Sequence, residues 1–193
     1  MQRICVYCGS SPGADEAFAA AARRLGLLLA ERDVGVVFGG GSVGLMGILA
    51  DAALSAGGSV TGVIPRHLAR KELAHANLTR LHIVETMHER KRLMAELSDG
   101  FIALPGGFGT LDEFAEMVTW RQLGHHDKPV ALLNVSGYFD HLLAFVAHAV
   151  DQRLIRAEHR AMILADDDPT RLLQRMLEAT PEAAGTDKWL DRG

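Results

Sequence analysis

The feature that most constrains the fold is a regular alternation of short apolar runs with segments that have a helical pattern. Short apolar runs bounded by glycine, proline or polar residues are typical of buried strands. The predicted strands cover residues 4–7, 34–38, 59–64, 81–84, 101–104, 130–133 and 162–164. The predicted helices cover residues 15–31, 45–56, 86–97, 111–123, 138–150 and 170–179. Strands that alternate with helices form parallel sheets with right-handed crossovers, so the sequence predicts an α/β fold, a Rossmann-like doubly wound parallel sheet with helices on both faces.

The chain has 193 residues, which suits one domain. We expect a single α/β domain over residues 1–180 and a loose, polar tail over residues 181–193. Residues 66–80 are polar and irregular in pattern, which predicts a mobile loop over a site. The N-terminus has no basic region before a long apolar stretch, and no apolar run reaches about 18 residues. A cytoplasmic location is therefore expected.

The charge balance argues against one class of partner. With 20 Lys and Arg against 24 Asp and Glu, the formal net charge is −4. A nucleic-acid-binding protein usually carries a basic stripe, so this class is disfavoured. A phosphorylated small molecule is still compatible, because one arginine and a ring of backbone N–H groups can hold a phosphate on an acidic protein.

Three glycine-containing loops follow predicted strands, at residues 9–13, 39–47 and 105–110. Ligands of doubly wound sheets bind beyond the carboxyl ends of the strands, so these loops are expected to meet there. Residues 39–44 match the G-x-G-x-x-G pattern of dinucleotide sites. The next strand ends without the acidic residue that would bind a ribose, which disfavours NAD. We interpret Gly40, Gly41 and Ser42 as a turn that a mononucleotide can approach, with a simple tight strand-to-helix turn as the alternative.

The loop at residues 105–113 is the most informative segment. Gly106, Gly107 and Gly109 permit positive φ angles and can form an anion-binding nest of backbone N–H groups. Thr110 is predicted to be the N-cap of the following helix, whose dipole also favours a bound phosphate. Glu113 follows three residues later, which is the spacing of a capping box. On pattern alone, a structural capping role for Glu113 is as well supported as a functional one.

Two other signals are interpreted as structural. Cys5 and Cys8 form a C-x-x-C pattern, but Cys5 lies in a predicted strand, where an offset of three points the side chains to opposite faces. We therefore predict two buried cysteines without a redox role. The nine histidines have no recognised metal-site spacing, so no metal is predicted.

At residues 105–113 the sequence resembles the P-G-G-x-G-T-x-x-E signature of the Lonely Guy (LOG) family, which are cytokinin riboside 5′-monophosphate phosphoribohydrolases. Residues 87–91 resemble the second motif of the family, and residues 39–47 its first glycine loop. Residues 119–124 are also similar. The resemblance extends over about residues 3–180, and the combination of two motifs is highly specific.

The resemblance implies that Arg90 and Glu113 are catalytic. The substrate contacts that it implies, together with those of the first glycine loop, are Glu72, Arg90, Lys91, Gly106, Gly107, Phe108, Gly109, Thr110, Thr119, Gly40, Gly41 and Ser42. The implied reaction is hydrolysis of the N-glycosidic bond of (N6-substituted) adenosine 5′-monophosphates, which releases a cytokinin base or adenine plus ribose 5-phosphate. A homodimer is also implied, with the helix at residues 86–97 as a candidate contact.

This chemistry fits the residues. Cleavage of an N-glycosidic bond leaves positive charge on the ribose, which a carboxylate at Glu113 could stabilise while it orients water. Arg90 could hold the phosphate or polarise the departing base, but its pKa is too high for a general acid. Without the resemblance, Arg90 and Lys91 would be interpreted as a solvated helix face.

Two alternatives follow from the family's relatives and its older description. A non-catalytic nucleotide or molybdenum-cofactor carrier protein has a related fold, but the presence of both Arg90 and Glu113 favours the enzyme. Members of the family were long described as possible lysine decarboxylases, a reaction that requires a lysine bonded to pyridoxal phosphate. None of the four lysines lies at a strand end in a recognisable cofactor site, so no cofactor is predicted.

Overall fold

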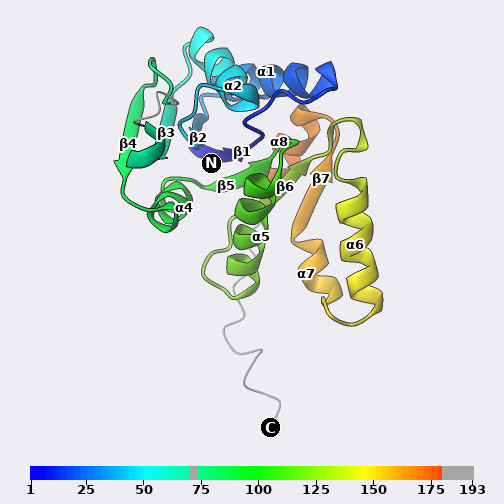
Figure 1. The fold of residues 1–193 in the computed structure, drawn as a ribbon. Helices are drawn as coiled ribbons and strands as arrows, with labels where there is room; N and C mark the ends of the chain where they lie inside the picture. The colour runs from blue at the N-terminus through cyan, green and yellow to red at the C-terminus, as the bar shows by residue number, and fades with distance from the viewer. Residues whose placement is uncertain (70–73, 180–193) are drawn as a thin grey trace.

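A single seven-stranded sheet organises the molecule (Figure 1). The computed structural model describes residues 1–69 and 74–179. The strands are β1 Arg3–Tyr7, β2 Gly35–Phe38, β3 Val60–Pro65, β4 Arg80–Val84, β5 Gly100–Ala103, β6 Val130–Leu133 and β7 Ile163–Asp166. All neighbouring pairs are parallel, in the order β4-β3-β2-β1-β5-β6-β7. The direction of winding reverses between β1 and β5, which makes that position the topological switch point.

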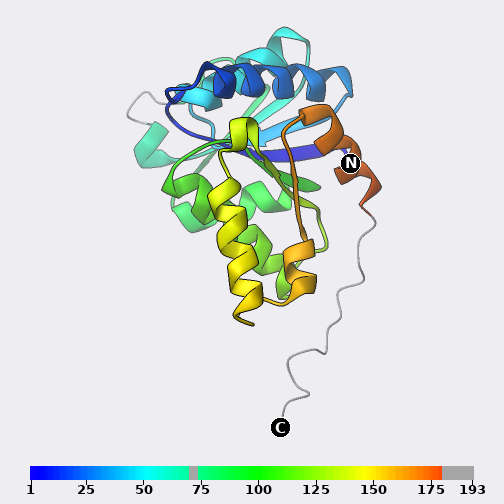
Figure 2. The same cartoon turned by 90° about the vertical axis from the view of Figure 1, so that its right-hand side faces the viewer.

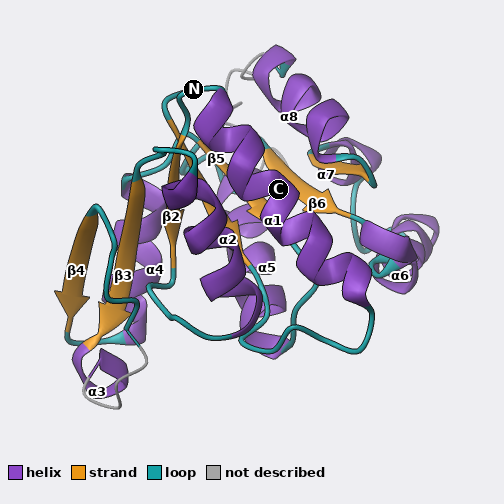
Figure 3. Ribbon diagram, turned by 90° about the horizontal axis from the view of Figure 1, so that it is seen from above, coloured by secondary structure: helices purple, strands orange, loops and turns teal. Residues whose placement is uncertain are grey.

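Helices cover both faces of the sheet (Figures 1 and 2). They are α1 Glu16–Glu31, α2 Gly44–Ser55, α3 Arg66–Leu68, α4 Met87–Glu96, α5 Phe108–Gln122, α6 Asp140–Asp151, α7 Ala157–Ala161 and α8 Pro169–Glu178, with a short 3-10 helix at Val135–Gly137. Seen from above, α1, α2 and α8 lie over one face (Figure 3). The opposite face is covered by α4, α5, α6 and α7 (Figure 1). The predicted doubly wound α/β fold is confirmed.

Strand β1 shows how the two faces are separated. Ile4 and Val6 belong to the apolar cluster under α1, α2 and α8, whereas Cys5 and Tyr7 belong to the cluster under α4, α5 and α6. Cys8 lies with the first cluster. The two free cysteines are therefore buried on opposite faces of the sheet, as predicted from their spacing.

Side-chain caps fix the starts of α1, α4 and α8 within one residue of the prediction. Asp15 Oδ1 accepts a hydrogen bond from the backbone N–H of Ala17 at the start of α1. Thr86 Oγ1 does the same for Glu89 at the start of α4. Both helices were predicted to start at these capping residues, which precede the first helical residue.

Helix α5 has no side-chain cap, and the prediction that Thr110 is its N-cap is wrong. The helix begins at Phe108, and its N-cap is Gly107, which has no side chain to cap it. The backbone N–H of Leu111 already donates to the carbonyl oxygen of Gly107, at 3.1 Å. Thr110 is therefore a buried residue of the first turn, and Glu113 lies in the second turn. Glu113 is too far along the helix to complete a capping box, so the structural alternative for this residue is removed.

The segment at residues 66–80 has more structure than its pattern predicts. It contains the single turn α3, and Ala74 forms an antiparallel bridge with Gly41. The backbone N–H of His75 donates to the carbonyl oxygen of Gly40, at 2.9 Å. This segment is thus tied to the first glycine loop. Glu72, which was predicted to contact the substrate, and the predicted tail at residues 181–193 lie outside the described residues. Within the described ranges, no helix has both the length and the apolar character needed to cross a membrane.

Candidate active site

The three glycine loops meet at the switch point, as the sequence predicts. The backbone N–H of Gly9 donates to the carbonyl oxygen of Pro105, at 3.0 Å, and the N–H of Leu45 donates to the carbonyl oxygen of Gly9, also at 3.0 Å. The first hydrogen bond joins the loop after β1 to the loop after β5. The second joins it to the start of α2. The carboxyl ends of the central strands therefore form one continuous surface.

The first glycine loop is crowded. A Cβ atom added to Gly39 would lie 1.9 Å from Nη2 of Arg90. Gly44 has a φ of +60°, and an added Cβ would lie 2.3 Å from the carbonyl carbon of Ser10. Of the predicted contacts in this loop, Gly40 and Gly41 are buried and only Ser42 is exposed. Gly39 and Gly44 are needed because other parts of the chain approach them closely.

The second glycine loop is open on the side that faces solvent. Gly106 is packed, since an added Cβ would lie 2.1 Å from Oγ1 of Thr110. Around Gly107 and Gly109, by contrast, an added Cβ would meet nothing within 4 Å. Phe108 between them is 92% exposed. The first backbone N–H groups of α5 have no intrahelical partner, so this end of the helix can receive an anion.

Arg90 and Glu113 form a partly buried ion pair beside this loop. Arg90 comes from α4 and Glu113 from α5, and Nη1 of Arg90 lies 3.2 Å from Oε1 of Glu113. Their side chains are only 13% and 9% exposed. Nε of Arg90 also donates to the carbonyl oxygen of Val63, at 3.2 Å, which fixes the plane of the guanidinium group. The two predicted catalytic residues are thus brought together.

The environment of Glu113 changes its acidity. Burial raises the pKa of its carboxyl group to about 7, against the opposing effect of the positive charge on Arg90. The carboxyl group can therefore gain or lose a proton near neutral pH. Its Oε1 atom, although ion-paired, accepts no hydrogen bond from the described part of the chain. This oxygen is buried, so its ion pair with Arg90 lies away from solvent.

Two other predicted contacts lie apart from this pair. Lys91 is buried, and its Nζ lies 3.1 Å from Oδ2 of Asp112 and 3.2 Å from Oε2 of Glu116. Thr119 is exposed, and its hydroxyl group donates to the carbonyl oxygen of Ala115, at 2.7 Å. It lies six residues after Glu113, or about 9 Å along the helix axis. Both side chains therefore make these contacts with α5 beyond its first turn.

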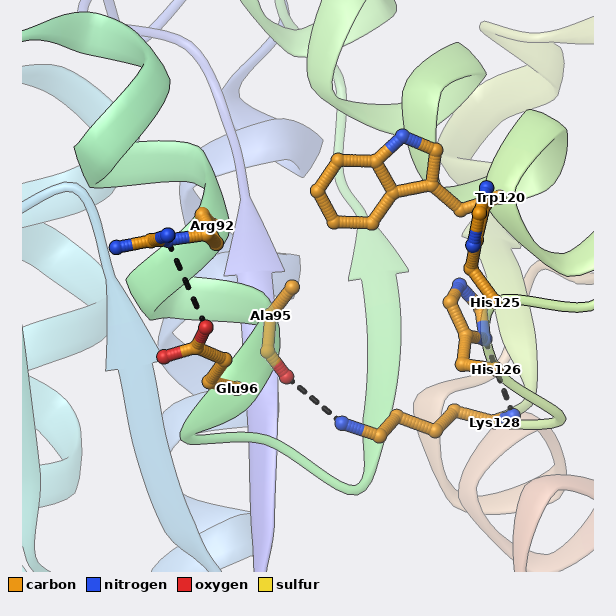
Figure 4. Close-up of a pocket in the computed structure, with 7 residues that line it drawn as sticks. All are labelled: Arg92, Ala95, Glu96, Trp120, His125, His126 and Lys128. Carbon is orange, nitrogen blue, oxygen red and sulfur yellow. Dashed lines mark hydrogen bonds and ion pairs between the residues drawn. The ribbon is translucent and has the colours of Figure 1, made fainter.

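Two cavities are large enough to receive a small ligand. One of about 310 Å³ lies at the switch point and is lined by residues 9–13, Phe18, Leu45, residues 105–107 and Tyr138. The other, of about 410 Å³, is lined by Arg92, Ala95, Glu96, Trp120, His125, His126 and Lys128 (Figure 4). Polar groups of the second cavity are already paired. Nζ of Lys128 donates to the carbonyl oxygen of Ala95, and Arg92 forms an ion pair with Glu96. The second cavity contains no predicted site residue, whereas the first cavity borders the open glycine loop.

Comparisons with known proteins identify the family. A sequence model described as "Possible lysine decarboxylase" matches residues 46–176. A probable cytokinin riboside 5′-monophosphate phosphoribohydrolase of rice, Oryza sativa subsp. japonica, is 47% identical over 190 residues, which cover 97% of this chain and 85% of the relative. A cytokinin riboside 5′-monophosphate phosphoribohydrolase of Arabidopsis thaliana is 45% identical over 181 residues, which cover 94% and 85%. The chain belongs to the Lonely Guy (LOG) family.

Solved structures at 20–22% identity share the fold. A molybdenum-cofactor carrier protein from Chlamydomonas reinhardtii superposes with a TM-score of 0.69 at 20% identity, covering 93% of this chain and 99% of that chain. The molybdenum-cofactor-binding protein from Rippkaea orientalis gives a TM-score of 0.70 at 22% identity, covering 92% and 97%. At this identity, the likeness shows the fold alone.

Some residues of this LOG-family site were missed by the sequence analysis. The hydroxyl group of Tyr138 donates to the carbonyl oxygen of Gly106, at 2.6 Å, and its ring lines the switch-point cavity. Gly39 gives the guanidinium group of Arg90 its space. Tyr138 is 32 residues from Gly106, so only the order of the strands brings the two together. Gly39 is the first glycine of residues 39–41, but this position in the sequence does not show that Arg90 lies against it.

Proposed function

We propose that the protein hydrolyses the N-glycosidic bond of (N6-substituted) adenosine 5′-monophosphates, releasing a cytokinin base or adenine plus ribose 5-phosphate. The observation that carries this proposal is the buried carboxyl group of Glu113, paired with Arg90 beside the open N-terminus of α5. Membership of the LOG family supports the same reaction, because the relatives at 44–48% identity are named for it.

The phosphate group of the nucleotide binds at the start of α5. Gly107 and Gly109 leave open space there, and the unpaired backbone N–H groups and the helix dipole both favour an anion. The exposed ring of Phe108 offers an apolar surface at the same position. A phosphate held in this way places the ribose near the second turn of α5, where Glu113 lies.

The chemical step separates charge at the C1′–N9 bond. As this bond breaks, positive charge develops on the ribose, and the ionised carboxylate of Glu113 stabilises it. The same carboxylate accepts a proton from the water whose oxygen bonds to C1′. The base leaves with the electron pair of the C1′–N9 bond and takes up a proton from solvent water, and Glu113 then returns its proton to solvent. Arg90 is a fixed cation held by Val63 and Glu113, so it stabilises negative charge on the phosphate or on the departing base.

The proposal is tested by incubating the full-length protein with isopentenyladenosine 5′-monophosphate or AMP and measuring free base by chromatography. We expect release of base by the wild-type protein, with Glu113→Gln and Arg90→Met each at least about a hundredfold slower. Glu31→Gln and Arg23→Met are the matched controls, because both residues lie exposed on α1. The ratio of the two wild-type rates sets the preference between substrates.

The same experiment distinguishes the enzyme from a non-catalytic carrier protein. The structural neighbours include molybdenum-cofactor carrier proteins, so a carrier of a nucleotide or of that cofactor is the competing function. If the folded wild-type protein binds AMP but releases no base from either nucleotide, the carrier function replaces the enzyme.

We also propose a homodimer in the cytoplasm. The LOG resemblance implies the dimer, and large apolar side chains are exposed away from the glycine loops, including Phe145 at 64% and Leu154 at 84%. Helix α4 is the contact predicted from the sequence. Light scattering at micromolar concentration should give twice the mass of the chain, and a monomeric mass would contradict the proposal.

A further inference from the structure

We propose that Tyr138 is a positioning residue for the phosphate site at the start of α5. Its hydroxyl group holds the peptide between Gly106 and Gly107 in the orientation that presents the N–H of Gly107 to the phosphate group of the nucleotide. This inference rests on the proposed function, because it assigns a role at the same site. Tyr138 belongs to the segment between β6 and α6, so it connects the end of another strand to that site.

The carbonyl oxygens of the second glycine loop are held one after another. That of Pro105 accepts a hydrogen bond from the N–H of Gly9, at 3.0 Å. That of Gly106 accepts one from the hydroxyl group of Tyr138, at 2.6 Å. The carbonyl oxygen of Gly107 accepts the first hydrogen bond of α5, at 3.1 Å. Of these three donors, only Tyr138 donates from a side chain, so only its hydrogen bond can be removed without a change in the backbone.

The hydrogen bond from Tyr138 fixes the direction of the next N–H group. The peptide between Gly106 and Gly107 is trans, and in a trans peptide the C=O and the N–H point to opposite sides. With the carbonyl oxygen turned toward Tyr138, the N–H of Gly107 points away from it. Gly107 is the N-cap of α5, so this N–H is one of those at the helix start without an intrahelical partner. Such groups bind anions.

This peptide depends on an outside hydrogen bond for its orientation. Glycine lies on both sides of it, so no Cβ atom restricts its rotation. Around Gly107, an added Cβ would meet nothing within 4 Å, so packing does not restrain that side either. The hydroxyl group of Tyr138 therefore supplies a restraint that the loop itself lacks.

The backbone that carries Tyr138 is itself fixed. The N–H of Tyr138 donates to the carbonyl oxygen of Val135, at 3.0 Å. Oδ1 of Asn134 accepts from the N–H of Phe139, and its Nδ2 donates to Oδ1 of Asp140, both at 2.7 Å. These hydrogen bonds hold the chain before and after Tyr138, which is the support that a positioning residue needs.

Two ring contacts set the direction of the side chain. Phe18 of α1 lies edge-on to the Tyr138 ring, with centroids 5.3 Å apart, and Phe139 does the same at 5.0 Å. Edge-to-face pairs of this kind are favourable in themselves. The ring should therefore stay in place when the hydroxyl group is removed, so Tyr138→Phe deletes the hydrogen bond to Gly106 and little else.

The test compares AMP with adenosine, which differ only in the phosphate group, as ligands of the full-length protein by calorimetry. Both are measured in Glu113→Gln, chosen to suppress turnover, with and without Tyr138→Phe. We expect Tyr138→Phe to weaken AMP binding about tenfold and adenosine binding by less than about twofold, because one hydrogen bond to a charged group is lost. With Glu113 intact, KM for AMP should rise by a similar factor, while kcat changes by less than about threefold.

Ser55→Ala is the matched control. Its hydroxyl group also donates to a backbone carbonyl oxygen, that of Ala52, at 2.8 Å. It lies at the last residue of α2, whereas the first glycine loop leads into the other end of that helix. Neither affinity should change by more than about twofold. A tenfold loss of AMP affinity in this variant as well would overturn the assignment, because the loss would not depend on Tyr138.

Nitrogen-15 NMR observes the Gly107 amide directly. Titration with inorganic phosphate should shift the Gly107 signal in the wild-type protein, and Tyr138→Phe should remove most of that shift at the same phosphate concentration. An equal shift in both proteins would contradict the proposed role. This titration uses the single variant, so it also decides the question if the double variant does not fold.

The role of Tyr138 and the proposed function can fail separately. Equal losses of AMP and adenosine affinity in Tyr138→Phe would make the hydroxyl group purely structural. If the wild-type protein releases no base but Tyr138→Phe weakens AMP binding selectively, the proposed function is wrong and the role of Tyr138 stands. If the wild-type protein releases base but Tyr138→Phe leaves AMP binding unchanged, the proposed function stands and the role of Tyr138 is wrong.

Discussion

The two glycine-rich loops on either side of β1 have similar compositions but different surroundings. In the first loop, an added Cβ at Gly39 or Gly44 would lie within 2.5 Å of another part of the chain. In the second loop, Gly107 and Gly109 face open space. Glycine therefore has a packing role in the first loop, where it admits Arg90 and Ser10. In the second loop, glycine leaves open space that a ligand can occupy.

Gly44→Ala should have the largest effect on stability. Gly44 combines a φ of +60° with a close approach to the backbone of Ser10, which cannot move away as a flexible side chain could. We expect the free energy of unfolding to fall by about 3 kcal/mol, measured by urea denaturation. Gly57→Ala is the control, because its φ is +78° but its surroundings are open. Its cost should be about 1 kcal/mol, and equal costs for both would contradict the role of packing.

Gly39→Ala should reduce kcat by about a hundredfold, because the new Cβ displaces the guanidinium group of Arg90 from Glu113. The loss should depend on Arg90. In a double-mutant cycle, adding Gly39→Ala to Arg90→Met should cause little further loss. If the two losses multiply instead, Gly39 acts through some other part of the site.

Gly109→Ala should weaken substrate binding without loss of stability, which is the opposite of the effect expected for Gly44→Ala. Alanine favours a helix over glycine, so stability should be unchanged or higher by up to about 1 kcal/mol. The methyl group would, however, occupy the space assigned to the phosphate, and we expect KM to rise about tenfold. Thermal denaturation and initial rates measure the two effects. An unchanged KM would show that the phosphate binds elsewhere.

The dependence of the rate on pH reports on Glu113 and not on the two glycine loops. Residues 39–47 and 105–110 contain no titratable side chain. Burial raises the pKa of Glu113 to about 7, and the proposed mechanism requires its ionised form. The rate should therefore fall as pH decreases through 7, by about tenfold for each unit below the pKa. Initial rates over the pH range measure this limb. A rate that stays constant to about pH 5 would show that ionised Glu113 is not required.

Much of this arrangement could be predicted from the sequence. Short apolar runs located the seven strands of the described residues. The rule that ligands bind beyond the carboxyl ends of parallel strands predicted that the three glycine loops meet. The offset of Cys5 and Cys8 placed them on opposite faces. These features depend on local pattern and on the general geometry of parallel sheets, so one sequence is sufficient to predict them.

Two kinds of feature were not predicted, a helix start that departs from local propensity and contacts between residues distant in sequence. The pattern assigned the N-cap of α5 to Thr110, because glycine is a poor helix former and threonine a common cap. The structure begins the helix at Phe108, with Gly109 inside its first turn. The ion pairs of Lys91 were not predicted because its partners lie 21 and 25 residues away on another helix. Only the packing of α4 against α5 reveals its ion pairs.

The most direct test of the central claim compares binding with turnover in Glu113→Gln. We predict that this variant binds AMP within about fivefold of the wild-type affinity by calorimetry, because the proposed phosphate site is the backbone of α5. Its release of base should fall at least about a hundredfold. Release of base at the wild-type rate would contradict the account, because Glu113 would then have no part in breaking the N-glycosidic bond.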